Sequence, residues 1–188
     1  MKINLERRVF IGIPIGGKIK SILPSLKTSI HSSRDIIRWI PPENIHLTLS
    51  FLGNISDQDI PNIIQSIENC ITSKYFKIII ESTGVFPSAN FPKTLWIGIG
   101  KGADDLTSLQ QDIEISVRKF KGIYRREKFM PHITIARIRR SRRKIDVLPF
   151  LNTVYSPIEL DINSICFYES ILLPEGAQYM VLTEFPLN

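Results

Sequence analysis

The chain of 188 residues has only two cysteines and three histidines, and it contains no long hydrophobic run. Cys70 and Cys166 lie far apart and have no CxxC or Cys/His companion, so the pattern favours neither a zinc site nor a disulfide framework. No apolar stretch approaches the roughly 18–20 residues that cross a bilayer. The run VFIGIPI at 9–15 has no small-residue cleavage site and predicts a buried strand rather than a signal peptide. We therefore expect a cytoplasmic protein without a membrane segment.

The net charge of +6 comes from one segment of the chain. Residues 121–144 contain ten Lys/Arg and a single acid, Glu127, whereas the remaining residues contain 14 basic and 17 acidic side chains. A solvated surface is the commoner explanation of a basic run. Clustered cations also supply the sequence-independent attraction for phosphates that nucleic-acid binders use. One of the three histidines lies in this segment, which favours a polyanion-binding role.

Patterns of hydrophobicity predict a mixed structure without linkers or low-complexity segments. Strands are predicted at about 7–14, 45–52, 76–86, 93–100, 132–138, 157–168 and 177–185. Helices are predicted at about 16–30, 56–73 and 103–120, with Ser56 as a candidate N-cap of the second. The pattern is that of one domain spanning residues 1–188.

Two of the three histidines share the pattern His-apolar-Thr-apolar, in IHLTLSF and PHITIAR. Because side chains alternate along a strand, His46, Thr48 and Ser50 should share one face. His132 and Thr134 should likewise lie on one face of the second strand. The two patterns lie close to half a chain length apart, which suggests two similar lobes that face each other.

A pair of histidines suits general acid/base chemistry, since imidazole titrates near neutrality. A neutral ring can take a proton from an attacking group, and a protonated ring can deliver one to a departing oxygen. Threonine hydroxyls can donate hydrogen bonds to the non-bridging oxygens of a phosphate. This chemistry requires no metal and no other cofactor, and the sequence has no carboxylate cluster typical of a two-metal nuclease. The alternative is a structural role for each histidine, hydrogen-bonded to its threonine.

Four stretches of the chain resemble a known family, and they occur in the order found in that family. HLTL and HITI are similar to the HxTx signatures of the two-histidine (2H) phosphoesterase superfamily. Their surroundings resemble its RNA 2',3'-cyclic phosphodiesterase branch, also called LigT-like 2'-5' RNA ligases. The four stretches are RVFIGIPI, WIPPENIHLTLSFLG, FMPHITIAR and EGAQYMVLTEFPL.

The resemblance implies a bilobal, pseudo-two-fold α+β fold in which two antiparallel sheets face a central cleft and helices lie outside. It implies hydrolysis of RNA 2',3'-cyclic phosphate ends, tRNA-derived ends among them, to 2'-phosphomonoesters. His46 would donate a proton to the leaving 3'-oxygen, and His132 would accept one from water. Thr48 and Thr134 would hold the phosphate. In the family's 2'-5' ligation a 5'-hydroxyl of RNA replaces water, and no nucleotide cofactor is needed.

Arg137 matches the arginine of that family and would clamp the phosphate. Strict alternation from His132 places Arg137 on the apolar face of the strand, unless a bulge or twist intervenes. Further candidate RNA contacts lie in or beside the basic segment: Tyr124, Arg125, Arg126, Lys128, Phe129, Arg139 and Arg140.

Other functions remain open from the sequence. The same cleft could serve a non-catalytic RNA-binding or nucleotide-binding module, or an enzyme for small cyclic nucleotides or 2'-5'-linked oligonucleotides. The stretch from Gly12 to Lys18 fits GxxxxGK, but Pro14 removes a backbone donor and Ile19 replaces the Ser/Thr that binds magnesium. This stretch is therefore not expected to bind a nucleoside triphosphate. Our main expectation is a monomeric protein that acts on RNA ends.

Overall fold

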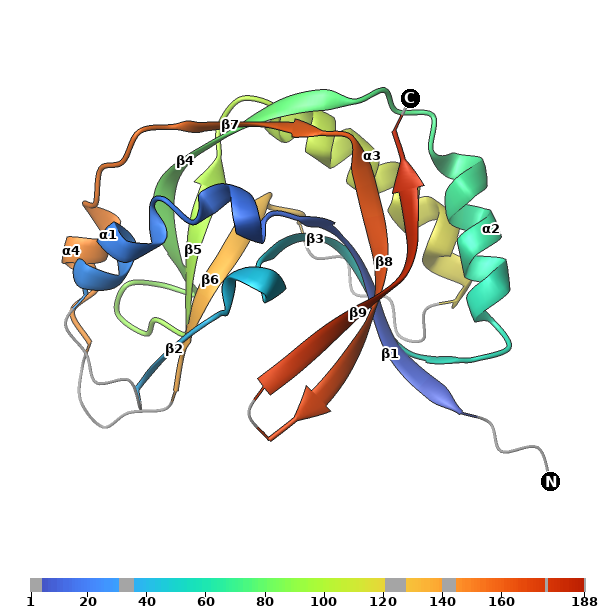
Figure 1. The fold of residues 1–188 in the computed structure, drawn as a ribbon, viewed down its shortest axis with the longest axis horizontal. Helices are drawn as coiled ribbons and strands as arrows, with labels where there is room; N and C mark the ends of the chain where they lie inside the picture. The colour runs from blue at the N-terminus through green and yellow to red at the C-terminus, as the bar shows by residue number, and fades with distance from the viewer. Residues whose placement is uncertain (1–4, 31–35, 121–127, 140–144, 175, 188) are drawn as a thin grey trace.

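The computed structural model describes residues 5–30, 36–120, 128–139, 145–174 and 176–187. In this part of the chain the strands form one curled antiparallel sheet (Figure 1). The strands are β1 (Glu6–Pro14), β2 (Ile37–Trp39), β3 (His46–Ser56), β4 (Phe76–Phe86), β5 (Thr94–Ile99), β6 (His132–Ile138), β7 (Ile158–Ile162), β8 (Ser164–Leu173) and β9 (Gly176–Pro186). Their order is β7-β4-β5-β6-β3-β1-β8-β9, and β2 pairs with β6.

Two halves of the sheet meet at its centre. One half contains β3, β1, β8 and β9, and the other contains β6, β5, β4 and β7, with β2 paired to β6. The two halves are joined at one register pair, Leu47 with Ile133. The sheet curls on either side of this junction into the arch seen in Figure 1. The predicted α+β fold is confirmed, and the two predicted sheets are the halves of one continuous sheet.

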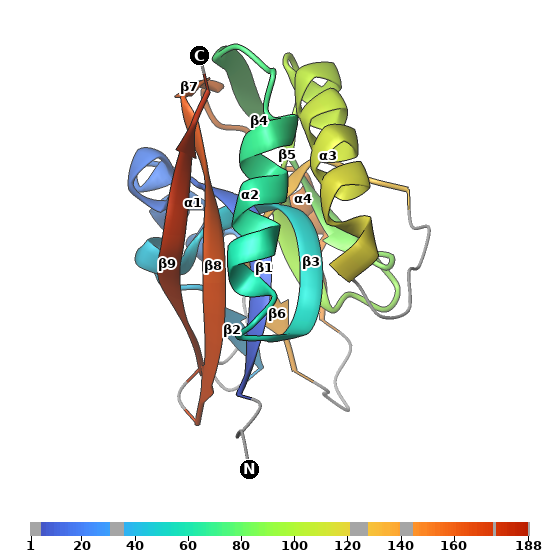
Figure 2. The same cartoon turned by 90° about the vertical axis from the view of Figure 1, so that its right-hand side faces the viewer.

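Two long helices cover one face of the sheet, α2 (Ile60–Cys70) and α3 (Ala103–Val117) (Figure 2). The helix predicted at 103–120 is confirmed, because α3 is followed directly by the 3-10 helix η3 (Arg118–Phe120). Its predicted apolar face is buried: Leu106, Leu109, Ile113 and Val117. The predicted start of the earlier helix at Ser56 is wrong. Ser56 pairs with Glu6 at the end of β3, so α2 begins only at Ile60.

The segment predicted as one helix at 16–30 contains two short ones, the 3-10 helix η1 (Gly16–Ile19) and α1 (Leu23–Thr28). Pro24 lies in the first turn of α1, where a backbone N–H has no helical acceptor, so it starts this helix rather than interrupting it. Gly12 and Pro14 belong to β1. The GxxxxGK stretch is therefore a strand followed by η1, not a phosphate-binding loop.

Most predicted strands are confirmed to within a few residues, but the strand predicted at 157–168 is wrong as a single element. It is two strands, β7 beside β4 and β8 beside β1, which separate at Asn163. The Asn163 carbonyl accepts a hydrogen bond of 2.8 Å from the backbone N–H of Leu187. The sequence also failed to predict β2, α4 (Leu148–Leu151) and the 3-10 helix η2 (Pro42–Asn44), since elements of three or four residues are too short to show a period.

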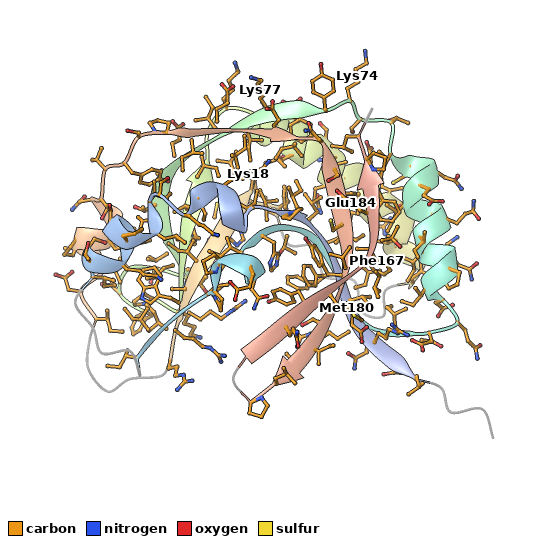
Figure 3. The ribbon with its side chains drawn as sticks, in the orientation of Figure 1. Lys18, Lys74, Lys77, Phe167, Met180 and Glu184 are labelled. Atoms are coloured by element: carbon orange, nitrogen blue, oxygen red, sulfur yellow. The ribbon has the colours of Figure 1, made fainter. Side chains whose placement is uncertain are left out.

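Aliphatic side chains from both halves form one main buried cluster. Leu47 and Ile133, the junction pair, are both fully buried in it. Figure 3 shows the side chains of this interior, and also Lys74 and Lys77 at the outer rim of the arch. Cys166 is buried, Cys70 is half-buried, and both are free thiols. Among the helices that the structure describes, none is long and apolar enough to cross a bilayer.

Candidate active site

His46 and His132 are the first residues of the two central strands. His46 immediately precedes Leu47, and His132 immediately precedes Ile133. The side chains of this junction pair point into the core. Because neighbouring side chains on a strand point to opposite faces, both histidines lie on the face opposite the core. The antiparallel register directs His46 toward Thr134 and His132 toward Thr48. The structure thus brings both predicted histidines and both threonines together at one junction.

The two imidazole rings are held in the same way. His46 Nδ1 lies 2.7 Å from the carbonyl oxygen of Asn44, and His132 Nδ1 lies 2.8 Å from that of Met130. A carbonyl oxygen only accepts hydrogen bonds, so Nδ1 carries the proton in each ring. Nε2 is then the nitrogen that can accept a proton in the neutral ring or donate one in the charged ring. Sequence reasoning missed these anchors, although both occupy the position two residues before the histidine.

Aromatic rings from flanking strands surround both histidines. The ring centroid of His46 lies 4.7 Å from Phe10, 5.0 Å from Tyr179 and 6.2 Å from Tyr168. That of His132 lies 5.0 Å from Phe86 and 6.1 Å from Trp96. Tyr179 and Phe86 each present an edge-on contact with an interplanar angle of 87°. These contacts fix the ring planes and take part of each imidazole out of water.

Burial lowers the pKa of both His46 and His132 below the ordinary value of 6.5. The hydrogen bonds to the Asn44 and Met130 carbonyls oppose part of this effect, and the positive charge of Arg137 lowers both pKa values further. His132 also lowers the pKa of His46. Arg137 and the two histidines are therefore one electrostatic group, in which the neutral imidazoles are favoured.

A β-bulge brings Arg137 to the histidine face. The β5–β6 register pairs Trp96 with Thr134 and Leu95 with Ala136, so Ile135 is the extra residue of β6. The extra residue shifts the alternation by one position beyond Thr134. Arg137 therefore lies on the same face as His132, and it lines the cavity beside the junction. Strict alternation, which places Arg137 on the apolar face, does not hold here.

The same bulge occurs in β3. The β1–β3 register pairs Gly12 with Thr48 and Ile11 with Ser50, so Leu49 is the extra residue. Ser50 consequently turns to the helix side, where it is 4% exposed and its hydroxyl donates a 2.8 Å hydrogen bond to Glu114 of α3. The prediction that Ser50 shares the face of His46 is therefore wrong.

Phe51 occupies the position in HLTLSF that Arg137 occupies in HITIAR. It is 56% exposed, and its ring centroid lies 5.6 Å from that of Phe10, which in turn contacts His46. The two histidine strands thus offer an arginine on one side of the junction and an open aromatic ring on the other.

Thr48 and Thr134 are half-buried, and in the part of the chain described here neither hydroxyl has a hydrogen-bond partner. Thr48 stands opposite Gly12, where an added Cβ would lie 2.8 Å from the Leu47 carbonyl oxygen and 3.5 Å from His46 Cδ2. Glycine is therefore required at position 12 for β1 to approach the histidine strand this closely. Both threonines remain available to a ligand between the rings.

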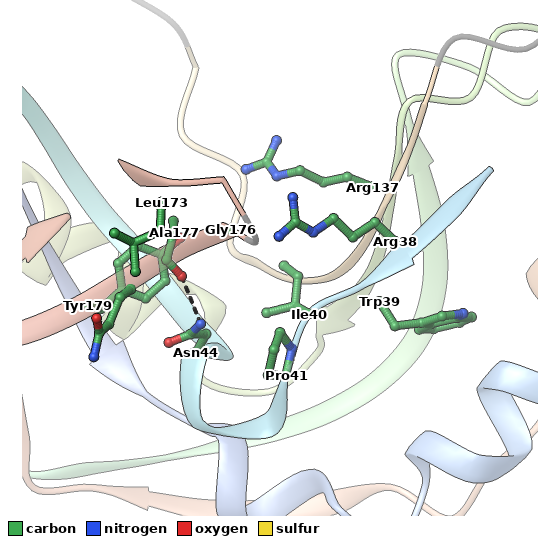
Figure 4. Close-up of a pocket in the computed structure, with 11 residues that line it drawn as sticks. Arg38, Trp39, Ile40, Pro41, Asn44, Arg137, Leu173, Gly176, Ala177 and Tyr179 are labelled. Carbon is green, nitrogen blue, oxygen red and sulfur yellow. Dashed lines mark hydrogen bonds between the residues drawn. The ribbon is translucent and has the colours of Figure 1, made fainter. Parts of the chain in front are cut away.

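A cavity of about 520 Å³ is lined in part by Asn44 and Tyr179, which both contact His46, whereas neither His46 nor His132 belongs to its lining (Figure 4). Arg38 and Arg137 line one side, and the β8–β9 hairpin lines the other with Gly176, Ala177 and Tyr179. The Asn44 amide spans the two sides by donating a 2.9 Å hydrogen bond to the Ala177 carbonyl. Arg38 was missed because β2 itself was not predicted.

The remaining predicted RNA contacts are more scattered. Lys128 and Arg139 are exposed, whereas Phe129 is half-buried and packs against the main core cluster. None of these three lines the described cavity. Tyr124, Arg125, Arg126 and Arg140 lie outside the described residues. Within the described ranges, no group of three His, Cys, Asp or Glu side chains could hold a metal ion.

Comparison with known proteins gives consistent results in sequence and structure. The chain is 32% identical over 187 residues to a protein of Aquifex aeolicus named RNA 2',3'-cyclic phosphodiesterase. The match covers 96% of this chain and 97% of the relative. It is 28% identical over 179 residues to a protein of the same name from Archaeoglobus fulgidus, covering 95% and 99%.

Solved structures have the same fold. A Thermus thermophilus protein gives a TM-score of 0.78 at 22% identity, covering 96% of this chain and 97% of that one. E. coli LigT in complex with 3'-AMP gives 0.77 at 18% identity, covering 97% and 99%. The family model for LigT-like phosphoesterases matches residues 17–96 and 97–179, so that each half of the chain with its histidine strand is matched. The chain therefore belongs to the LigT-like phosphoesterase family.

Proposed function

We propose that this protein hydrolyses the 2',3'-cyclic phosphate at RNA 3' ends to a 2'-phosphomonoester by acid/base catalysis with two histidines and no metal. The observation that carries the proposal is the matched pair of imidazoles, each with Nδ1 bound to a carbonyl oxygen and Nε2 left for the substrate. The relatives named RNA 2',3'-cyclic phosphodiesterase support the substrate class.

The reaction needs one proton acceptor and one proton donor. His132 Nε2 accepts a proton from water as the water oxygen forms its bond to phosphorus. His46 Nε2 donates a proton to the 3'-oxygen as the P–O3' bond breaks, which leaves the phosphate on the 2'-oxygen. The two rings exchange protonation states in one turnover and return to the starting state through solvent.

The lowered pKa values fit the two roles differently. A neutral His132 is ready to act as the base near neutral pH, and burial and the charge of Arg137 both favour that form. His46 must gain a proton before it can act as the acid. The negative charge of a bound cyclic phosphate favours the protonated ring, so substrate binding itself raises the pKa of His46.

Three further side chains support the phosphate, and a fourth supports the base. The Thr48 and Thr134 hydroxyls donate hydrogen bonds to the non-bridging oxygens, and the Arg137 guanidinium offsets their charge as the transition state forms. Phe51 offers its exposed ring as a stacking surface for the terminal base. Because each half of the molecule supplies one histidine, residues 1–188 act as a single bilobal unit.

The test uses an RNA oligonucleotide that ends in a 2',3'-cyclic phosphate, incubated in EDTA with wild type, His46→Ala and His132→Ala. Wild type should form the 2'-phosphate, and each variant should lose about 10²- to 10⁴-fold in rate. His31→Ala is the matched control and should retain activity, since His31 lacks the HxTx pattern. Loss of wild-type activity on chelation alone, or release of a 3'-phosphate, would contradict the mechanism.

The same ring opening with another nucleophile extends the proposal to 2'-5' ligation. If a 5'-hydroxyl of a second RNA replaces water, the same donor and acceptor form a 2'-5' phosphodiester, and the energy comes from opening the cyclic ester. The reaction should proceed without a nucleoside triphosphate at high concentrations of 5'-hydroxyl RNA. Absence of a joined product under these conditions, with hydrolysis intact, would restrict the enzyme to hydrolysis.

A further inference from the structure

Two arginines stand opposite each other at the edge of the candidate active site. Arg38 of β2 and Arg137 of β6 are register partners in an antiparallel pair, so their side chains share one face of the sheet. Like charges at directly opposed positions destabilise a sheet. Within the described residues, no carboxylate forms an ion pair with either guanidinium. The arrangement is unfavourable for the protein alone and favourable once an anion binds.

The cavity next to these arginines is built for an anion. Both guanidiniums project into it toward the β8–β9 hairpin (Figure 4), and no described residue of its lining is acidic. Glu175, beside Gly176, lies outside the described residues. Arg38 is half-buried and its guanidinium lies against Gly176, where any Cβ would collide with it. The guanidinium therefore lies close to the backbone of the hairpin that faces β2.

The walls of the cavity strengthen its attraction for a charged group. Ile40, Pro41 and Leu173 line it together with the two arginines. Arg38 is half-buried beside these apolar side chains, so a phosphate contact of its guanidinium is screened less by water and counter-ions than one on the open surface. The cavity holds about 520 Å³, which is ample for a phosphodiester with part of its ribose.

The chemistry of an RNA end defines which phosphate can reach Arg38. A nucleotide with a 2',3'-cyclic phosphate carries no further phosphate on its 3' side, so the neighbouring phosphate of an RNA chain is the one on its 5'-oxygen. The charge of Arg137 lowers the pKa of both histidines, so we assign Arg137 to the cyclic phosphate. Arg38 lies on the neighbouring strand β2, directly opposite Arg137, and lines the cavity beside it, where a second phosphate of the substrate could bind.

We propose that Arg38 and the cavity beside it form a subsite for the 5'-phosphate of the terminal nucleotide, which makes the enzyme select RNA ends over cyclic mononucleosides. This inference rests on the proposed function, because it places the cyclic phosphate at the two histidines. Arg38 takes no part in proton transfer: it is a specificity residue that supplies a bidentate contact to a phosphodiester.

The turnover experiment compares adenosine 2',3'-cyclic phosphate with the same compound bearing a 5'-phosphate. The measured quantity is the 5'-phosphate preference, the ratio of the two kcat/KM values. Wild type should prefer the 5'-phosphorylated substrate roughly 10- to 100-fold, and Arg38→Ala should bring the ratio close to one. Arg38→Lys should restore only part of it, since lysine cannot form the bidentate contact.

The matched control is Lys74→Ala, which removes one positive charge from the outer rim of the arch. It should keep the wild-type ratio. A purely structural role of Arg38 would lower both kcat/KM values and leave their ratio unchanged, and that result would overturn the proposal. Equal kcat/KM values of wild type for the two substrates would overturn it as well.

Binding of product-like nucleotides separates this inference from the proposed function. Adenosine 2',5'-bisphosphate should bind wild type more tightly than adenosine 2'-monophosphate by calorimetry, and Arg38→Ala should remove the difference. If wild type turns over neither cyclic substrate, the proposed function fails while the subsite is still judged by this pair of affinities. Equal affinities in wild type would overturn the subsite even if turnover is observed.

Discussion

His46 and His132 have the same backbone anchor but different surroundings. Three aromatic rings lie within 6.2 Å of His46, whereas two lie within 6.1 Å of His132. Burial is the main reason for the lowered pKa of each ring, and among the described residues the charge of Arg137 lowers the pKa of both. A single arginine thus adjusts the donor and the acceptor together, and this can be measured without any assay of activity.

Replacing Arg137 with glutamine should raise the pKa of both histidines. The positive charge disfavours each imidazolium, so its removal makes protonation easier, and both titrations move toward higher pH. Burial remains in the variant, and both values should therefore stay below 6.5. NMR titration of the imidazole ring protons measures each pKa, with His31 as an internal reference. A shift of only one of the two rings, or a shift toward lower pH, would contradict the electrostatic group described here.

Backbone irregularities decide which side chains of the two histidine strands reach the site. Leu49 and Ile135 are extra residues at equivalent places, so Phe51 and Arg137 turn to the histidine face while Ser50 and Ala136 turn away. The regular parts of these strands were predictable from β-branched alternation, and so was the shared face of each histidine and its threonine. The bulges were not, because Leu49 and Ile135 look like ordinary core residues in the sequence.

Other parts of the site also escaped prediction for physical reasons. The strand β2, which carries Arg38, has three residues, and its position depends on pairing with β6 rather than on its own periodicity. Phe10 and Tyr179 reach His46 only because β1 and β9 lie where the sheet order places them. Contacts of this kind depend on tertiary register, which local propensity does not encode.

Gly12→Ala should damage the contact between β1 and β3. The new methyl would lie 2.8 Å from the Leu47 carbonyl oxygen, so one strand must move, and His46 Cδ2 is only 3.5 Å away. We expect a loss of about 1–3 kcal/mol in the free energy of unfolding, together with a lower kcat/KM as His46 shifts. Urea unfolding and the cyclic phosphate assay measure the two effects. Gly17→Ala is the control, since no atom lies within 4 Å of its added Cβ, and wild-type-like behaviour of both variants would refute the close approach.

The net positive charge of the whole molecule is concentrated around one of its two histidine strands. The junction of Leu47 and Ile133 joins two halves that each bring one histidine, and the basic segment of residues 121–144 includes His132 and the rest of its strand. Counter-ion release makes such a basic segment matter for long RNA and much less for a single nucleotide. The salt dependence of kcat/KM should therefore differ between an RNA oligonucleotide and a single nucleotide, although both undergo the same chemical step.

For an RNA oligonucleotide, kcat/KM should fall steeply with salt, by a slope of about 0.7 per phosphate contacted in a log–log plot. For adenosine 2',3'-cyclic phosphate the slope should be small. Replacing Arg125 and Arg126 together with glutamine should reduce the slope for the oligonucleotide and leave the small substrate unaffected. Lys74→Gln and Lys77→Gln together provide a charge-matched control at the outer rim of the arch. Identical slopes for both substrates would refute a role for the basic segment.

The most direct measurement of the acid and base assignment uses a substrate in which sulfur replaces the 3'-oxygen of the cyclic phosphate. A thiolate leaves without protonation, so the step assigned to His46 becomes unnecessary, while activation of water is still required. We expect His46→Ala to recover most of its lost rate on the sulfur substrate, relative to wild type, and His132→Ala to remain inactive. Recovery by His132→Ala instead, or by neither variant, would contradict the assignment of His46 as donor and His132 as acceptor.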